Sequence, residues 1–327
     1  MRGAQLFRQP ADKPETDQST RNATRMDASS LTSLPAMGGD QLLALTDLDA
    51  KALQALVRDI GIPARPQLLV DLQQELERDD PSIKRVADIA GSDVALSAAL
   101  LKYANSPLMG LSRRADTVDQ AFQLLGFAQC QAIFTEIVLR KLLPATGPGL
   151  TRFWDVSAKR ARAMTYLART RRVVPPALAH TYGLFVELGI AILLQRFPGK
   201  SGYVATLEKC NVHEGSITAL EQSIHGVDHA LVGALTARTW GVSQTAVLAT
   251  RLHHEYSSWM GPMPPQVREL VALGLVCETI IQRYQGLNRH IEWSKGGAIA
   301  LAALGMTEAD LEVWCEDVHA QFAATGV

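Results

Sequence analysis

The sequence predicts an all-α protein, and three observations carry this prediction. Apolar residues recur at steps of three and four from Gln41 onward, which is the period of helices that bury one face. Helix-capping and helix-ending residues, mainly Asp, Thr, Gly and Pro, interrupt that pattern between the expected helices. The strict alternation that is typical of half-buried strands is missing from the sequence.

The N-terminal half divides into a polar segment and a helical lobe. Residues 1–40 have no sustained apolar period, so we expect a mobile tail that cannot offset the entropy of ordering. We predict that the first helical lobe spans 41–143. Gly61 and Pro63 end its first helix, and the next helix follows Pro66.

The later helices of this lobe have recognisable starts. Their predicted capping residues are Asp80 followed by Pro81, then Asp93, then Thr117 with Gln120 as a capping box. Asn105 precedes Ser106-Pro107 and is expected to end a helix by adopting the left-handed conformation. Gly126 ends the helix that Thr117 begins, and a longer helix follows over 128–143.

The segment from Pro144 to Gly149 holds two prolines and two glycines in six residues, so we predict a hinge or boundary there. A second helical lobe is expected over 150–258, with C-terminal helices over 259–327 packed on it. The helical patterns fall at 152–170, 176–196, 202–211, 215–223, 228–239, 243–256, 265–285, 295–304 and 307–323.

Composition narrows the class of protein. Hydrophobic residues make up 47% of the 327 residues and charged residues 20%, as in a globular chain. A net charge of -1 gives no global electrostatic reason to bind nucleic acid or an anionic membrane. No run approaches about eighteen apolar residues, and the N-terminus lacks the apolar stretch of a signal peptide. We therefore expect a cytoplasmic protein without membrane insertion.

The four cysteines are far apart in the sequence and form no CxxC pair. We interpret them as buried free thiols of a reducing compartment rather than as disulfides or a thiolate zinc site. They are Cys130, Cys210, Cys277 and Cys315.

Three segments, in this order, carry a family resemblance: "VADIAGSDVALSAALLKYANSPLMG" (86–110), "TVDQAFQLLGFAQCQAIFTEIVLRK" (117–141) and "HALVGALTARTWGVSQTAVLATRLHHE" (229–255). An Asn-Ser-Pro turn, a Leu-Gly turn and a late His-His pair make this order specific. The chain resembles the HDOD family, bacterial signalling domains related to the HD-type phosphohydrolases, over roughly 58–258. The resemblance implies a two-lobed helical bundle and a regulatory role.

The resemblance also implies where the metal ligands of an HD-type enzyme would stand, and several have been lost. The first His falls on Val156, and the His-Asp dipeptide falls on Val186 and Glu187. Valine has no lone pair and cannot ligate, and Glu is one methylene longer than Asp. The last Asp of the family pattern falls on Glu278. We therefore expect no catalysis and no resident metal.

An alternative stays open, because His229, His253 and His254 are present. With Glu187 and Glu278 they could form a residual site for a single Fe, Mn or Zn ion, since imidazole and carboxylate suit these metals. The interpretation that we favour is that these side chains hydrogen-bond within the bundle or face solvent.

One cluster of basic residues stands out on the helix after the predicted hinge. Arg152, Lys159, Arg162 and Arg169 recur near one side of it. They could form a surface for an anion, such as a nucleotide, or for an acidic protein partner. The alternative is an ordinary solvated face that acidic residues elsewhere balance.

The sequence lacks the P-loop, the strand-linked GxGxxG, the HExxH and the GxSxG motifs. The favoured function is a non-catalytic regulatory module that acts in trans through contacts with signalling proteins of two-component or cyclic-dinucleotide pathways. A divergent metal-dependent phosphohydrolase and a nucleotide-binding sensor remain as alternatives.

Overall fold

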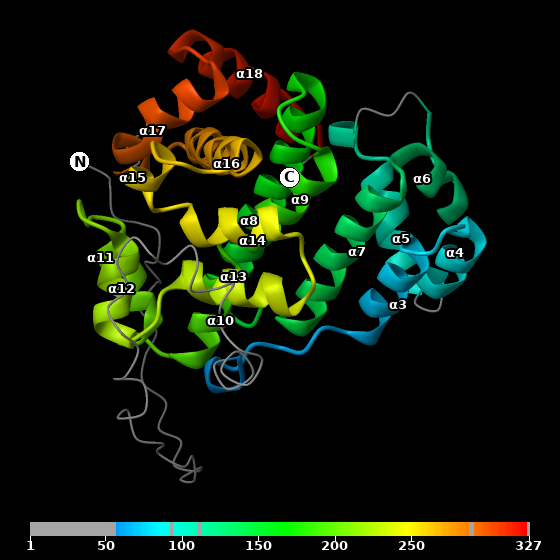
Figure 1. Ribbon diagram of the computed structural model, residues 1–327, viewed down its shortest axis with the longest axis horizontal. Coiled ribbons are helices and arrows are strands. Elements are labelled where there is room, and N and C mark those ends of the chain that lie inside the picture. The colour runs from blue at the N-terminus through cyan, green and yellow to red at the C-terminus, as the bar shows by residue number, and fades with distance from the viewer. Residues whose placement is uncertain (1–56, 92–93, 110–112, 288–290, 326–327) are drawn as a thin grey trace, which may run out of the picture.

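The protein is described by a computed structural model over residues 57–91, 94–109, 113–287 and 291–325, and these residues form helices and no strand (Figure 1). The predicted all-α class is thereby confirmed. The predicted tail over 1–40, most of the helix expected from Gln41 and the Asp93 cap lie outside the described residues. All four cysteines are buried and free, as the sequence indicates.

The helices of the first group begin and end near the capping and helix-ending residues that the sequence predicts. It consists of α3 (Gln67–Leu76), α4 (Ile83–Gly91), α5 (Val94–Ala104), the short 3-10 helix η2 (Pro107–Met109), α6 (Val118–Leu125) and α7 (Phe127–Leu142). Thr117 caps α6, since its side chain accepts a hydrogen bond from the backbone N–H of Gln120. Gly126 has φ +78°, a conformation that glycine adopts without strain, and α6 meets α7 there with a bend of 119°.

Asn105 ends α5 but does so differently from the prediction. The left-handed conformation is wrong for it, because Arg172 is the sole non-glycine residue with positive φ among the described residues. Instead, its side-chain amide donates to the carbonyl of Ala115 and accepts from the N–H of Ala115, both at 2.8 Å. The pair closes the loop that carries η2, and the Met109 carbonyl in that loop accepts a hydrogen bond from Arg169.

The second group of helices begins after residues 143–147. It consists of α8 (Pro148–Arg171), α9 (Pro176–Phe185), α10 (Leu188–Arg196), α11 (Tyr203–Cys210), α12 (Ile217–His225), α13 (His229–Thr239), α14 (Gln244–Leu252), α15 (Tyr256–Trp259), α16 (Pro265–Tyr284), α17 (Ile291–Leu304) and α18 (Glu308–Thr325). Helix α8 packs along α9 and α16, α13 packs between α10 and α14, and α17 packs on α16.

Two helices that the sequence predicts as continuous are broken. The pattern over 176–196 forms α9 and α10, separated at Val186 and Glu187. The pattern over 243–256 ends as α14 at Leu252, and α15 is a separate short turn. No glycine or proline marks either break in the sequence, so the packing of neighbouring helices decides them. Both breaks lie beside the candidate site described below.

The apolar core joins the two groups of helices. One cluster of buried side chains includes residues of α3 to α7 together with residues of α10 and α13, and a second lies among α8, α9, α14 and α16 to α18. The segment Pro176–Arg196 is long and apolar enough to cross a membrane, but 67% of its most apolar stretch is buried inside the fold. Its apolar character therefore serves the core. Lobe boundaries near 143 and 258 stay a prediction.

Candidate functional site

Glu187 lies at the break between α9 and α10, where it is the N-terminal cap residue of α10. Helix α10 approaches α13 very closely at Gly189, since a Cβ there would lie 2.0 Å from the carbonyl oxygen of His229. Gly233 on α13 is close to the Phe185 carbonyl in the same way, since a Cβ on Gly233 would lie 3.0 Å from that oxygen. Gly189 and Gly233 let the backbone around the α9–α10 break approach α13 closely. Glu187 therefore lies beside His229.

His229 is the first residue of α13 and is only 1% exposed. Asp228 caps the helix by accepting from the Leu231 N–H at 2.8 Å. The Nδ1 of His229 lies 2.7 Å from Oε2 of Glu221 on α12, and that oxygen also accepts from the His229 backbone N–H at 2.9 Å. Tyr203 donates to the other oxygen of Glu221. The buried carboxylate thus fixes both the ring and the start of the helix.

His253 and His254 follow the last residue of α14. The Nδ1 of His253 lies 2.7 Å from the Thr250 carbonyl oxygen. The Nδ1 of His254 lies 2.8 Å from Oε2 of Glu292, which belongs to α17. Each ring is therefore held at Nδ1 by an oxygen acceptor, and its Nε2 is turned toward the other rings.

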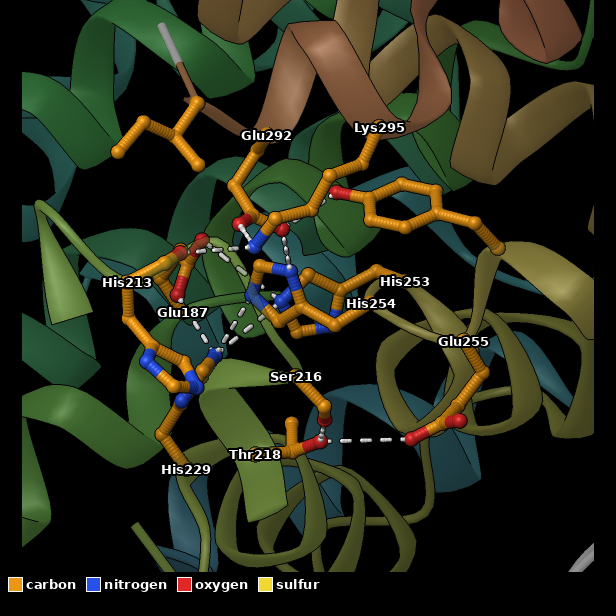
Figure 2. A network of polar contacts seen from close by, with 12 residues as sticks. Glu187, His213, Ser216, Thr218, His229, His253, His254, Glu255, Glu292 and Lys295 are labelled. Atoms are coloured by element: carbon orange, nitrogen blue, oxygen red, sulfur yellow. Dashed lines mark hydrogen bonds and ion pairs between the residues drawn. The ribbon is translucent and has the colours of Figure 1, made fainter. Parts of the chain in front are cut away.

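The four side chains converge from α10, α13 and the end of α14 (Figure 2). The Nε2 of His229 lies 3.3 Å from the Nε2 of His253 and 3.1 Å from the Nε2 of His254. Oε2 of Glu187 lies 3.2 Å from the Nε2 of His229, and its Oε1 lies 3.7 Å from the Nε2 of His253. One imidazole-rich cluster with a carboxylate is the result, and we call these four residues the His-Glu cluster.

The groups around the His-Glu cluster favour a positive charge on one of its imidazole rings. Burial lowers the pKa of His229, but the carboxylates of Glu221 and Glu187 outweigh it and the net pKa is well above the usual value. Burial, with the neighbouring His253, lowers the pKa of His254 to about 4. Burial raises the pKa of Glu187, but His229 and His253 bring the net pKa well below the usual value. These shifts favour a protonated His229 beside an ionised Glu187.

Glu278 does not join this cluster. Its Oε2 accepts from both Nε and Nη2 of Arg160 on α8, at 3.1 and 2.7 Å. Burial lowers the pKa of Arg160, but Glu278 and Glu187 raise it to a net value above the usual one. A guanidinium thus faces the two acidic positions that the resemblance assigned to metal ligands. Val186 is buried, and Val156 packs against the apolar core.

The four basic residues predicted as an anion surface are each engaged by neighbouring groups of the fold. Lys159 is 6% exposed and pairs with Asp155. The guanidinium of Arg162 lies over the ring of Tyr103, at 5.2 Å from the ring centre. Arg152 bonds to Gln285 and Arg169 to the Met109 carbonyl. Arg152, Arg162 and Arg169 thus link α8 to other parts of the fold, and Lys159 pairs within α8.

Sequence reasoning missed the residues that orient the rings, Glu221 and Glu292. Glu221 precedes His229 by eight residues, across a turn at Gly226 with φ +72°, so no helical spacing links them. Glu292 lies 38 residues after His254, and contact at that separation depends on how α17 packs. The interruption at Gly226 also keeps His225 out of the cluster, and His225 bonds to Thr206 instead.

The donor set fits a single small divalent cation. Three imidazole nitrogens and one carboxylate are ligands that Zn²⁺ and Fe²⁺ accept, and their ligand atoms lie within 4.8 Å of one another. The residues present do not fit an HD-type dinuclear centre, because valines stand at the two positions where the resemblance implies histidine ligands and Arg160 pairs with Glu278.

Comparison with solved structures agrees on the fold. The crystal structure of a "Putative phosphohydrolase" from Shewanella amazonensis SB2B has a TM-score of 0.62 at 22% identity, over 83% of this chain and 95% of that one. An HDOD domain protein of unknown function from Geobacter sulfurreducens has a TM-score of 0.58 at 18% identity, over 84% and 99%. A "Putative signal transduction protein" from Marinobacter aquaeolei VT8 has a TM-score of 0.59 at 17% identity, over 83% and 59%.

Similarity to curated proteins is confined to part of longer chains. An uncharacterized protein of Treponema pallidum (strain Nichols) is 24% identical over 196 residues, which is 59% of this chain and 37% of that protein. The uncharacterized protein YuxH of Bacillus subtilis (strain 168) is 30% identical over 115 residues, 35% of this chain and 28% of that protein. The HDOD domain matches residues 62–256, more than half of the sequence. The chain belongs to the HDOD domain family.

Proposed function

We propose that this protein is a non-catalytic regulatory module of bacterial signal transduction that acts in the cytoplasm through protein contacts. Its membership of the HDOD family supports a signalling role. A structural neighbour is named as a signal transduction protein, and others are named as phosphohydrolases. Non-catalysis must therefore be argued from the site itself.

The observation that carries the proposal is the ion pair of Arg160 and Glu278. Metal-dependent hydrolysis needs an ion with an open position, where bound water becomes the nucleophile. Arg160 is 5% exposed and donates two hydrogen bonds to Glu278. A guanidinium neutralises a carboxylate but cannot bind and activate water as a metal does. Val156 and Val186 offer no ligand at the two positions where the resemblance implies histidines, which leaves this half of the site without hydrolytic chemistry.

A hydrolysis assay on the full chain tests the proposal. Purified protein would be incubated with bis(p-nitrophenyl) phosphate and with cyclic dinucleotides, in the presence of Mn²⁺, Fe²⁺ or Zn²⁺. We expect the rate of product release to equal that of a Glu187→Gln variant and of the buffer. Turnover above both, lost in Glu187→Gln, would establish the divergent phosphohydrolase instead.

The partner is proposed to be a signalling protein of a two-component or cyclic-dinucleotide pathway. A nucleotide sensor that uses the basic helix is disfavoured, because Arg152, Lys159, Arg162 and Arg169 already interact within the fold. Calorimetric titration of the full chain with cyclic dinucleotides distinguishes the two functions. We expect no heat of binding, whereas saturable heat that is lost in Arg162→Ala would support the sensor.

A further inference from the structure

We infer that the outer side of α12 is an interface through which two copies of this chain pair. It is made by Ile217, Ala219, Leu220, Ser223 and Ile224, and we call it the α12 face. The inference goes beyond the regulatory function proposed above and does not depend on it, because a catalytic and a non-catalytic chain could pair in the same way. Three features carry it: apolar side chains that the core does not use, a surface without charge, and a helix that its neighbours hold in place.

The α12 face carries apolar side chains that do not serve the core. Ile217, Leu220 and Ile224 follow one another at steps of three and four, so they lie on one side of the helix. Within the described residues, none of the three packs against either apolar cluster, and Ile224 is 42% exposed. The apolar side of a surface helix normally faces the core. Here it faces outward, at the edge of the molecule beside α11 (Figure 1), which is typical of a surface that binds another protein.

The α12 face is also uncharged, and this limits the partners that it suits. Ala219 and Ser223 complete its exposed side, and the acidic residue of the helix, Glu221, is fully buried on the inner side. The exposed side of α18 is different, since it carries several acidic residues, among them Glu312 and Glu316. A face without Lys or Arg does not attract nucleic acid or an anionic membrane. A face without charge also offers no ion pair to a charged protein.

A second copy of the chain is the partner that this chemistry favours. Two uncharged apolar faces are complementary, and no like charges oppose each other where two α12 faces meet about a twofold axis. The net charge of the chain is only -1, so the copies do not repel each other strongly. Ala219 and Ser223 are one helical turn apart. Their short side chains let the two helices approach, while Leu220 and Ile224 of each copy pack against the other.

Helix α12 is held in place before any partner binds. Ser216 caps its start by accepting from the Ala219 N–H at 3.2 Å, and Gly226, with φ +72°, ends it. On the inner side, Glu221 accepts from the N–H of His229 at 2.9 Å. A helix that is already ordered loses little conformational entropy when it binds. Because Glu221 joins α12 to the start of α13, pairing would also be coupled to the position of the His229 ring.

The oligomeric state of the full chain tests this inference. Sedimentation velocity would be recorded over a range of protein concentrations. We expect the average mass to rise with concentration toward twice that of one chain, because a contact made mainly by one helix from each copy is small and therefore weak. The mass of a single chain at every concentration, up to the high micromolar range, would overturn the inference.

Charged variants show whether the α12 face makes the contact. Ile224→Asp and Ala219→Arg each place like charges between the two copies, so each should abolish the rise in mass. Val313→Asp is the matched control, because Val313 is a similarly exposed apolar residue, 50% exposed, on α18. It should leave the rise unchanged. Circular dichroism and thermal melting check that every variant is folded. Pairing that persists in both α12 variants would place the contact elsewhere and overturn the inference.

A mixture of variants identifies the partner as a second copy. Ile224→Asp and Ile224→Lys should each be monomeric alone, and an equimolar mixture should pair again, because opposite charges then meet across the axis. A mixture that stays monomeric would show that something other than a second copy covers the α12 face, and the inference would fail. Hydrolysis plays no part in these measurements, so the proposed function and this inference can fail separately.

Discussion

The imidazole of His229 is held on both sides by acidic groups. Glu221 accepts the hydrogen bond from Nδ1, and Glu187 faces Nε2. Glu221 is itself fully buried and held by the hydroxyl of Tyr203 and the N–H of His229. Substitution of Glu221 should change the orientation and basicity of the His229 ring without removing that ring. Its effect therefore reports on the positioning of the ligand and not on its loss.

Glu221→Gln tests this positioning at the scale of one residue. The amide keeps the shape but removes the charge, so His229 becomes a weaker ligand and Zn²⁺ affinity should fall by about 10-fold to 100-fold. Glu255→Gln is the control, since Glu255 bonds to Thr218 instead of to a ring of the cluster. Calorimetry with Zn²⁺ on the three proteins measures the difference. Equal affinities for Glu221→Gln and wild type would refute the role of Glu221.

Arg160→Met tests the ion pair between Arg160 and Glu278, which lies near Glu187. The variant leaves Glu278 without its guanidinium and removes the charge that faces Glu187. Breaking a largely buried pair should lower the free energy of unfolding by about 2–4 kcal/mol. Arg171→Met, at a more exposed pair with Asp317, should cost at most about 1 kcal/mol. Urea denaturation gives both values, and equal losses would contradict the importance of burial at Arg160.

The sequence indicates which residues of the site carry chemistry, but not how they meet. His229, His253, His254 and Glu187 could all be named in advance, because few side chains ligate metals and the family pattern places them. The pairing of Glu278 with Arg160 could not, because a carboxylate looks the same in sequence whether it faces a metal or a guanidinium. Contacts across 118 residues, as in this pair, depend on the packing of α8 against α16.

At the scale of elements, helix ends place the functional groups. Glu187 stands at the break between α9 and α10, His229 starts α13, and His253 ends α14. The start of α13 was predictable, because the side chain of Asp228 gives a capping signal. The break at Glu187 was not, since Val186 and Glu187 are both compatible with a continuous helix. It follows from the tight crossing of α10 over α13.

Gly189→Ala tests that crossing. The added methyl group would lie 2.0 Å from the His229 carbonyl oxygen, which belongs to the backbone, so α10 and α13 must separate. We expect a loss of about 1–3 kcal/mol in the free energy of unfolding, together with weaker Zn²⁺ binding, because Glu187 moves away from His229. Gly261→Ala is the control, with its nearest atom at an ordinary 3.4 Å. Both variants would be compared by urea denaturation, and a neutral Gly189→Ala would show that the helices do not meet so closely.

At the scale of the whole molecule, the shared apolar core determines whether the two groups of helices are stable independently of each other. The short linker at 143–147 could suggest two units that fold separately. Yet the buried cluster that contains Leu72, Leu100 and Ile133 of the N-terminal helices also contains Leu188 of α10 and Leu235 of α13. Helix α7 also packs on α9, and a buried contact between Tyr103 and His180 joins α5 to α9. Removal of one group would expose apolar surface of the other.

The two groups of helices should therefore unfold together. All five tryptophans lie after residue 150, and Trp154 and Trp240 among them bond to Leu143 and Pro63, so their fluorescence reports on the second group and on its contact with the first. Hydrogen exchange of peptides from α3 to α7, measured by mass spectrometry across the same urea series, reports on the first group. We expect the same midpoint from both probes, because the shared core makes unfolding of either group costly for the other. If α3 to α7 exchanged fully at a urea concentration where the fluorescence is still native, the N-terminal helices would be an independent unit, and the shared cluster would contribute little to the stability of the whole.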